Sequence, residues 1–372
     1  MTRTYLDHNA TSPLRPEARD AMMHAFDTLG NPSGLHGHAR AARKLIEDAR
    51  EAVALGMGVC AQDLVFTGSG TESDNTAIHS AWCAGTKRML IAEMDHPATL
   101  NAAQGCCGAQ MEKIPCNAHG QTDMNWLRER LARWEAVDGR PFVSIVAANS
   151  ETGVVQDIDT ATEIVREAGG LLLVDAVQAL GKLPMTYQPD YLAVSAHKLG
   201  GPQGVGALYA SPDAPFTPLL SGGGQERRRR AGTSNVAGIS GFGAAARAAE
   251  GGFDVSGLRD QIEVELKAFE PDVVIFGEAA DRLSNTTFFA VPDMSGQTAL
   301  MNLDLEGVSI STGTACSSGV SKTSRVVEAM GLAARAPVGA MRVSLGYTST
   351  QADVDAFLSA WKKIRMRNRK AV

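Results

Sequence analysis

The sequence has few cysteines, no long apolar run and no excess of basic charge, and each absence excludes a class of protein. Six cysteines among 372 residues, with no CxxC pair, exclude a disulfide scaffold and the common spacing of zinc ligands. No apolar run approaches the roughly 20 residues that span a bilayer, and the first residues lack the basic start and apolar middle of a signal peptide. We therefore expect a cytoplasmic protein with reduced thiols and no membrane partner.

The charge balance argues against nucleic acid as a partner. The 35 Lys and Arg residues and 41 Asp and Glu residues give a formal net charge of −6. One run of arginines, 227–230, indicates an anion pocket or a solvated loop in such an acidic chain. His36 and His38 have no third ligand near them in the sequence, so we predict no metal site.

The sequence does have a globular composition and a regular alternation of strand and helix patterns. Hydrophobic residues make up 44% and charged residues 20%. Between residues 60 and 250 the alternation indicates an α/β fold with a mostly parallel sheet covered by helices, in which each connection is long enough for a parallel crossover. The predicted strands are 63–67, 88–93, 141–148, 171–174, 191–195 and 206–210. The predicted helices include 35–57, 71–84, 123–134 and 160–168.

The pattern changes after about residue 255. A helix, a strand at 285–291, a helix, a strand at 341–345 and a final helix indicate a smaller α+β domain. We expect a large domain of residues 15–254 and a small domain formed by 1–14 and 255–372.

Polar side chains follow two of the predicted strands, where ligands bind in open α/β sheets. Asp175 follows the strand at 171–174, and Lys198 follows the strand at 191–195 and precedes a glycine-rich loop. A lysine there can form a Schiff base with an aldehyde cofactor, and the aspartate can hold a pyridine nitrogen protonated. A lysine beside a strand is more often a solvated surface residue, but the glycine-rich loop makes that interpretation weaker here.

The segment 67–75, TGSGTESDN, lies between a predicted strand and a predicted helix. Backbone N–H groups, the helix dipole and the Thr71 hydroxyl can all face an anion there. By itself the segment is equally consistent with a plain turn and N-cap.

Motifs along almost the whole chain match one known family in order and spacing. They are YLDHNATSPL from Tyr5, GNPSGLHGHAR from Gly30, FTGSGTESDN from Phe66, EMDHPAT from Glu93, NSETGVVQDI from Asn149, VDAVQALGKLP from Val174, SAHKLGGPQGVGALY from Ser195, GGGQERRRRAGTSNV from Gly222, TGTACSSG from Thr312 and RVSLG from Arg342. The chain resembles the NifS/IscS-like cysteine desulfurases of the fold type I, class V aminotransferase family. The resemblance implies pyridoxal 5′-phosphate (PLP) as cofactor, L-cysteine as substrate, a homodimer, and a sulfur-acceptor protein that the sequence does not identify.

The resemblance also implies a role for each matching residue. Lys198 would carry PLP, Asp175 would pair with its pyridine nitrogen, and His96 would stack on its ring. The remaining cofactor ligands would be Gln178 and Asn149 at the phenolic oxygen, and Gly70, Thr71, Ser195, His197 and the partner subunit's Thr233 at the phosphate. Arg342 and Asn31 would bind the substrate carboxylate.

Cys316 lies among small polar residues that suit an exposed loop. A single cysteine is more often structural, and only the resemblance reverses that interpretation. It implies that the Cys316 thiolate attacks the sulfur of the substrate, which leaves a persulfide on the protein and alanine as the second product.

Two positions depart from the family pattern. Arg228 stands where glycine is usual, so it is strained if its φ is positive, and Ser150 stands where relatives often have asparagine. The alternative functions are selenocysteine lyase, another class V aminotransferase, which would not need Cys316, and a non-catalytic relative, against which intact Lys198 and Asp175 argue.

Overall fold

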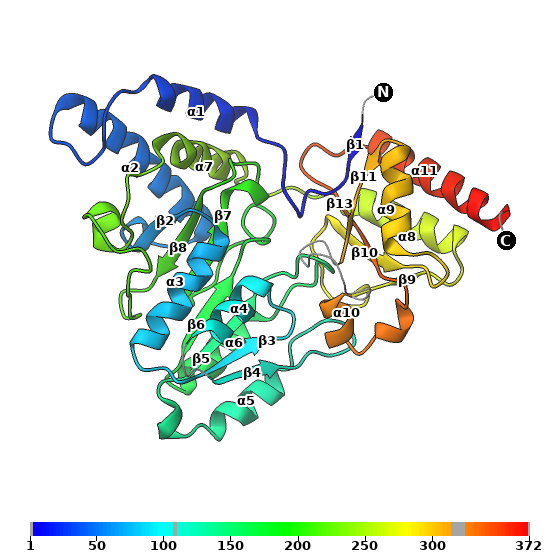
Figure 1. Ribbon diagram of the computed structural model, residues 1–372, viewed down its shortest axis with the longest axis horizontal. Coiled ribbons are helices and arrows are strands. Elements are labelled where there is room, and N and C mark those ends of the chain that lie inside the picture. The colour runs from blue at the N-terminus through cyan, green and yellow to red at the C-terminus, as the bar shows by residue number, and fades with distance from the viewer. Residues whose placement is uncertain (1–2, 107–109, 314–323, 371–372) are drawn as a thin grey trace.

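The computed structural model describes residues 3–106, 110–313 and 324–370, and these form two lobes (Figure 1). The larger lobe contains a seven-stranded sheet in the order β2-β8-β7-β6-β5-β3-β4. Its strands are β2 (Leu64–Thr67), β3 (Arg88–Ala92), β4 (Gln110–Ile114), β5 (Phe142–Val146), β6 (Leu171–Asp175), β7 (Tyr191–Ser195) and β8 (Gly206–Ala210). All six predicted strands are therefore confirmed. The sheet also contains β4, which the sequence did not predict because this half-exposed edge strand has the mixed sequence QMEKI.

The direction of one strand differs from the prediction. β8 runs antiparallel to both of its neighbours, β7 and β2, so the expectation of a parallel crossover at every connection is wrong there. Only residues 196–205 join β7 to β8, and they contain one short 3-10 turn, Ala196–Lys198. A parallel return needs a crossover of a dozen residues or more, usually with a helix. The short reversal leaves Lys198 at the end of β7.

Helices cover both faces of this sheet, as the alternation predicted. Since successive side chains of a strand point to opposite faces, Leu90 and Met89 of β3 belong to two different apolar cores. The first core includes side chains of α1 (Pro16–Asp27), α2 (Gly37–Met57), α5 (Met124–Ala132), α6 (Ile158–Glu167) and α7 (Val236–Ala248). The second is covered by α3 (Gly70–Cys83) and α4 (Pro97–Gly105).

The smaller lobe has an antiparallel sheet in the order β12-β13-β10-β9. Its strands are β9 (Val274–Ile275), β10 (Thr286–Ala290), β12 (Ser311–Thr312) and β13 (Met341–Ser344). Its helices are α8 (Ser256–Phe269), α9 (Gly296–Leu305), α10 (Arg325–Ala329) and α11 (Gln351–Lys370). The predicted order of helix, strand, helix, strand and helix is confirmed, whereas the two-residue strands and α10 are too short to show a periodic pattern.

The N-terminal segment connects the lobes (Figure 1). Strand β1 (Thr4–Tyr5) pairs in parallel with β11 (Val308–Ser309), and Leu6 lies in the core of the smaller lobe. The chain then crosses to the larger lobe, where the Arg15 Nε donates to the Leu199 carbonyl at 2.8 Å. This path supports a small domain that includes the first residues, and the proposed boundaries at 14/15 and 254/255 stay a prediction. Within the described ranges, no helix has the length and apolar character needed to cross a membrane.

Candidate active site at the carboxyl ends of β6 and β7

Lys198 and Asp175 lie at the same edge of the large sheet. Asp175 ends β6, Lys198 follows β7, and these two strands are parallel neighbours. The Lys198 amine donates to the backbone carbonyls of Asn9 at 2.6 Å and Ala10 at 3.0 Å. The buried Asp175 carboxyl accepts the Val177 N–H at 2.9 Å. The structure thus brings together the two residues that the sequence singled out first.

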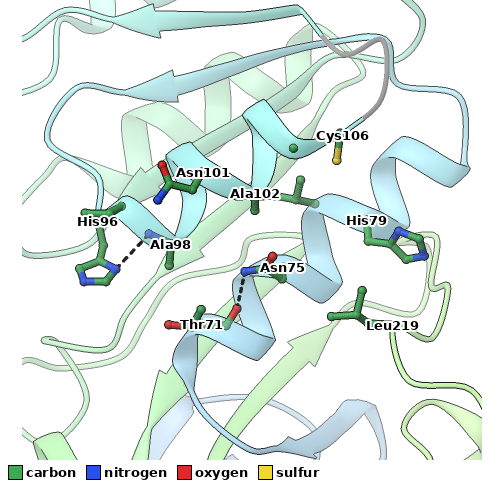
Figure 2. A pocket seen from close by; sticks show the side chains of 12 residues that line it. Thr71, Asn75, His79, His96, Ala98, Asn101, Ala102, Cys106 and Leu219 are labelled. Atoms are coloured by element: carbon green, nitrogen blue, oxygen red, sulfur yellow. Dashed lines mark hydrogen bonds between the residues drawn. The ribbon is translucent and has the colours of Figure 1, made fainter. Parts of the chain in front are cut away.

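His96 lies close enough to these two groups to interact with both electrostatically. Burial raises the pKa of Asp175, and the nearby His96 and Lys198 oppose that rise. Burial lowers the pKa of His96; the charge of Lys198 lowers it further, while the Asp175 carboxylate opposes this. His96 caps α4, with its Nδ1 accepting the Ala98 N–H at 3.2 Å (Figure 2). The neutral ring therefore carries its proton on Nε2.

A cavity of about 560 Å³ opens between α3 and α4. Figure 2 shows Thr71 and His96 at one end of it and His79 and Cys106 at the other. Thr71 and His96 are the predicted cofactor ligands that line it, so the cavity extends from the predicted site along the two helices.

The N-terminus of α3 lies close to the ends of β6 and β7. The Ser69 hydroxyl caps α3 by accepting the Glu72 N–H at 3.1 Å. A Cβ at Gly70 would lie 2.7 Å from the Val177 Cγ2 and 3.6 Å from the Ser195 Cβ, so only glycine allows this approach. Three of the predicted phosphate ligands, Gly70, Thr71 and Ser195, are thereby gathered where helix N–H groups attract an anion.

His197 and Gln178 lie beside Lys198. The His197 Nδ1 is 3.2 Å from the Thr11 hydroxyl, and burial together with the charge of Lys198 lowers the pKa of His197 to about 4. The Gln178 Nε2 donates to the Asn9 carbonyl at 2.9 Å, so Gln178 and Lys198 share one acceptor.

Asn9 and Lys182 belong to this network although sequence reasoning did not select them. The Lys182 amine donates to the Asn9 Oδ1 at 3.0 Å and to the Gln178 Oε1 at 2.7 Å. Burial, with the charges of Lys198 and Arg342, holds the pKa of Lys182 well below its usual range. Both residues lie inside the matching motifs from Tyr5 and Val174, which is the signal that could have found them.

Arg342 reaches the site from the small lobe. Its Nη1 donates to the Ser150 carbonyl at 2.9 Å and its Nη2 to the Asp7 carboxylate at 2.7 Å. Its buried Nε has no hydrogen-bond partner among the described residues. The Asn149 side chain, nearby in sequence to Ser150, donates to the Met94 carbonyl at 2.8 Å and accepts the N–H groups of the turn that follows.

Two predicted residues are not brought to this place within one chain. Asn31 is exposed in the loop before α2, and no contact joins it to Arg342 in the part of the chain that the structure describes. Thr233 is exposed before α7 and lines a separate hollow of about 60 Å³ with Gly68 and Arg230. Cys316 lies outside the described residues.

The sequence matches the class V aminotransferase family over residues 4–357. The chain belongs to this family. It is 40% identical over 370 residues to a cysteine desulfurase of Cereibacter sphaeroides, with 96% of this chain and 94% of the relative covered. A NifS-like protein of Rickettsia africae has a similar structure, with a TM-score of 0.88 at 31% identity over 98% of this chain and 99% of that one. SspA in complex with cysteine matches with a TM-score of 0.79 at 26% identity over 93% of this chain and all of that one, 100%.

These matches confirm the family and fold predicted from the motifs. Class V aminotransferases use PLP, and the full-length relatives at close to 40% identity support cysteine desulfurase as the activity. Arg228, which stands where the resemblance implies glycine, has an unusual backbone conformation in the structure.

Three consecutive residues form a left-handed turn, with φ of 45° at Glu226, 57° at Arg227 and 67° at Arg228. The Glu226 carboxylate holds the turn, because it binds the Arg50 guanidinium at 2.7 and 2.9 Å and accepts the Phe66 N–H at 2.9 Å. Residues other than glycine rarely adopt such φ values. Arg228 was expected to be strained if its φ is positive, and this condition is met.

Replacing Arg228 by glycine should raise the free energy of unfolding by about 1 kcal/mol, because glycine adopts positive φ without strain. Urea unfolding of the purified protein measures the change. Arg229→Gly is the matched control: Arg229 has a φ of −88°, so glycine there should destabilise the protein. An Arg228→Gly protein less stable than wild type would contradict the claim that the backbone at Arg228 is strained.

The buried carboxyl of Asp95 should make the stability of the protein depend on pH. Burial raises the pKa of its carboxyl to about 7, although the Ser144 hydroxyl and the Val146 N–H oppose the rise. Because the folded pKa lies above the unfolded one, the contribution of this carboxyl to stability is present below about pH 4 and is lost as pH rises to 7. As pH rises between these values, wild type should therefore lose on the order of 3 kcal/mol of unfolding free energy relative to Asp95→Asn. Urea unfolding of both proteins at several pH values measures this change. A difference in unfolding free energy between them that stays constant with pH would refute the raised pKa of Asp95.

Proposed function

We propose that this chain is a PLP-dependent cysteine desulfurase that converts L-cysteine to alanine and a persulfide on Cys316. The observation that carries the proposal is the placement of the Lys198 amine and the Asp175 carboxyl at one edge of the sheet, where each affects the other electrostatically. The similarity to cysteine desulfurases over almost the whole chain supports the substrate.

The residues present fit PLP. The Lys198 amine can bond to the aldehyde, and the buried Asp175 carboxyl can face the pyridine nitrogen. The approach of α3 that Gly70 permits offers N–H groups, with the Thr71 and Ser195 hydroxyls, to a phosphate. When bound, PLP supplies an electron-withdrawing ring that weakens bonds at the carbon atoms of the attached amino acid.

The protein's own groups orient the substrate and move protons. We assign the substrate carboxylate to Arg342, whose guanidinium is fixed by the Ser150 carbonyl and the Asp7 carboxylate. The Lys198 amine, oriented by the carbonyls of Asn9 and Ala10, takes and returns the proton at the substrate Cα. The His96 Nε2–H is a second proton donor close to Lys198 and Asp175.

Sulfur transfer then forms one bond and breaks another. The Cys316 thiolate attacks the substrate sulfur, an S–S bond forms as the C–S bond breaks, and the electron pair returns to the substrate carbon, which takes up a proton to give alanine. The outer sulfur of this persulfide passes to an acceptor protein, and the Cys316 thiol is restored.

A second copy of the chain is the proposed partner of this site. Thr233, Asn31 and several large apolar side chains are exposed on the larger lobe or its loops. These side chains are Met23, Phe26, Leu29, Leu35, Leu219 and Leu220. A homodimer that covers them could supply Thr233 of one copy to the phosphate of the other.

Lys198→Ala should remove the visible absorption band of the lysine-bound cofactor, because the amine assigned to the aldehyde is lost while the nearby Lys182 amine is held by Asn9 and Gln178. The purified wild-type protein should be yellow, and the spectrum after incubation with PLP measures the loss. Lys44→Ala, which changes an exposed lysine paired with Asp48 on α2, is the control and should leave the band intact. An unchanged spectrum for Lys198→Ala would sink the assignment.

Cys316→Ser should keep the color and lower sulfide release from cysteine in the presence of a thiol reductant by at least roughly 100-fold, since serine cannot accept sulfur. Mass spectrometry of the protein should show no persulfide at position 316. Cys83→Ser, which removes an exposed thiol, should behave as wild type. Release by Cys316→Ser at the wild-type rate would show that another group accepts the sulfur.

A further inference from the structure

The Lys182 amine binds two side-chain oxygens close to the Lys198 amine. It donates to the Gln178 Oε1 at 2.7 Å and to the Asn9 Oδ1 at 3.0 Å. Gln178 and Asn9 are buried, and Lys182 is half-buried. The sulfur chemistry proposed above does not use the Lys182 amine, although it lies within the network that holds Lys198.

The orientation of the Asn9 amide is fixed by other partners. Its Nδ2 donates to the Thr286 hydroxyl at 2.8 Å and to the Ser150 carbonyl at 3.2 Å. Its Oδ1 also accepts from the Asn285 Nδ2 at 3.0 Å. The oxygen of this amide therefore faces Lys182, and it holds the amine in one place.

The Gln178 amide is oriented by a donor on one side and an acceptor on the other. Burial, with the charges of Lys198 and Arg342, lowers the pKa of Lys182. Protonated or neutral, the Lys182 amine has at least two N–H groups, so it binds the oxygen end of Gln178. The nitrogen end donates to the Asn9 carbonyl, which can only accept, at 2.9 Å. A reversed amide would place two acceptors against each other.

The same Asn9 carbonyl accepts from the Lys198 amine at 2.6 Å, so the Gln178 Nε2 and the Lys198 Nζ meet at one oxygen. Among the residues that the structure describes, this carbonyl is the one acceptor of the Gln178 Nε2, which has a second N–H to donate. The phenolic oxygen of PLP is attached to the ring carbon next to the one that bears the aldehyde. A cofactor bonded to Lys198 therefore carries this oxygen close to the Gln178 Nε2.

We propose that Lys182 is a positioning residue, which holds the Gln178 Oε1 so that the Gln178 Nε2–H donates to the phenolic oxygen of a cofactor carried by Lys198. This inference rests on the proposed function and deepens it. A hydrogen bond to the phenolic oxygen stabilises its negative charge, and the neighbouring nitrogen becomes a weaker base. Lys182 thus lowers the pH at which the lysine-bound cofactor gives up its proton.

Lys182→Met keeps most of the side-chain length and removes the donors. In this variant the visible band of the lysine-bound cofactor should move to the near ultraviolet at a pH about 0.5 to 1 unit above the wild-type midpoint, as expected for the loss of one hydrogen bond. An absorbance titration of the purified, cofactor-loaded protein measures the midpoint. Lys362→Met is the control, because Lys362 donates to Glu265 at 2.9 Å in the smaller lobe, and its midpoint should equal that of wild type.

A double-mutant cycle separates positioning from the charge of Lys182. Gln178→Ala, which removes the donor itself, should raise the midpoint at least as much as Lys182→Met does. In the Gln178→Ala background, Lys182→Met should cause no further shift, whereas a direct effect of the Lys182 charge on the cofactor would persist. An equal shift in both backgrounds, or no shift in either, overturns the inference.

If Lys182→Met does not fold, Gln178→Glu is the second test of the orientation. Lys182 can still hold one carboxylate oxygen, and the other then replaces the Nε2–H beside the cofactor. The added negative charge should raise the midpoint by more than about one unit. A midpoint equal to that of wild type would show that the Nε2 end of Gln178 does not face the phenolic oxygen.

The proposed function fails in a different measurement. If wild type has the visible band and forms no alanine from cysteine, the desulfurase activity is refuted, and the titration still decides the role of Lys182. If wild type shows no visible band after incubation with PLP, both proposals are overturned.

Discussion

The site depends on the N-terminal segment, which makes hydrogen bonds to both lobes, and in particular on Asn9 of this segment. The Asn9 carbonyl accepts from Lys198 and Gln178 of the larger lobe. Its side chain donates to the Thr286 hydroxyl and accepts from Asn285, both of the smaller lobe. A buried amide without these partners would cost free energy, so the hydrogen bonds that satisfy Asn9 also fix the two lobes relative to each other. These hydrogen bonds therefore help to set the position of Lys198 relative to Arg342 on β13.

Much of the large lobe could be predicted because its signals are local. Continuously apolar segments gave the central strands, and a polar residue directly after β6 and a lysine after β7 marked the site edge. The antiparallel direction of β8 was also implied by the short glycine-rich connection, but the general expectation of crossovers outweighed it. The hydrogen-bond partners of Asn9 lie 100 or more residues away in sequence, and no pattern in a single sequence shows such contacts.

The departure at Arg228 shows how a family difference becomes a physical one. The family resemblance implied only that glycine is usual there, and the positive φ gives a physical reason for it. The cost of a left-handed turn is offset by the buried Glu226 carboxylate, which binds Arg50 and the backbone of Phe66. At the second departure, Ser150, the contacts do not involve the side chain, since Arg342 and Asn9 both bind its backbone carbonyl.

The electrostatics of the site favour anionic ligands. Burial lowers the pKa of His197 and of Lys182, and the charge of Lys198 lowers both further, with Arg342 adding to the effect on Lys182. Burial likewise lowers the pKa of His8 to about 4, and the charge of Lys182 adds to this effect. Burial is the largest cause of each of these shifts, and the neighbouring positive charges add to it. A phosphate at the start of α3 or a carboxylate at Arg342 would oppose these shifts, since an opposite charge within a few ångströms favours the protonated form. Binding of either anion would therefore draw protons into the site, and the groups that receive them lie beside the amine that the proposed chemistry requires.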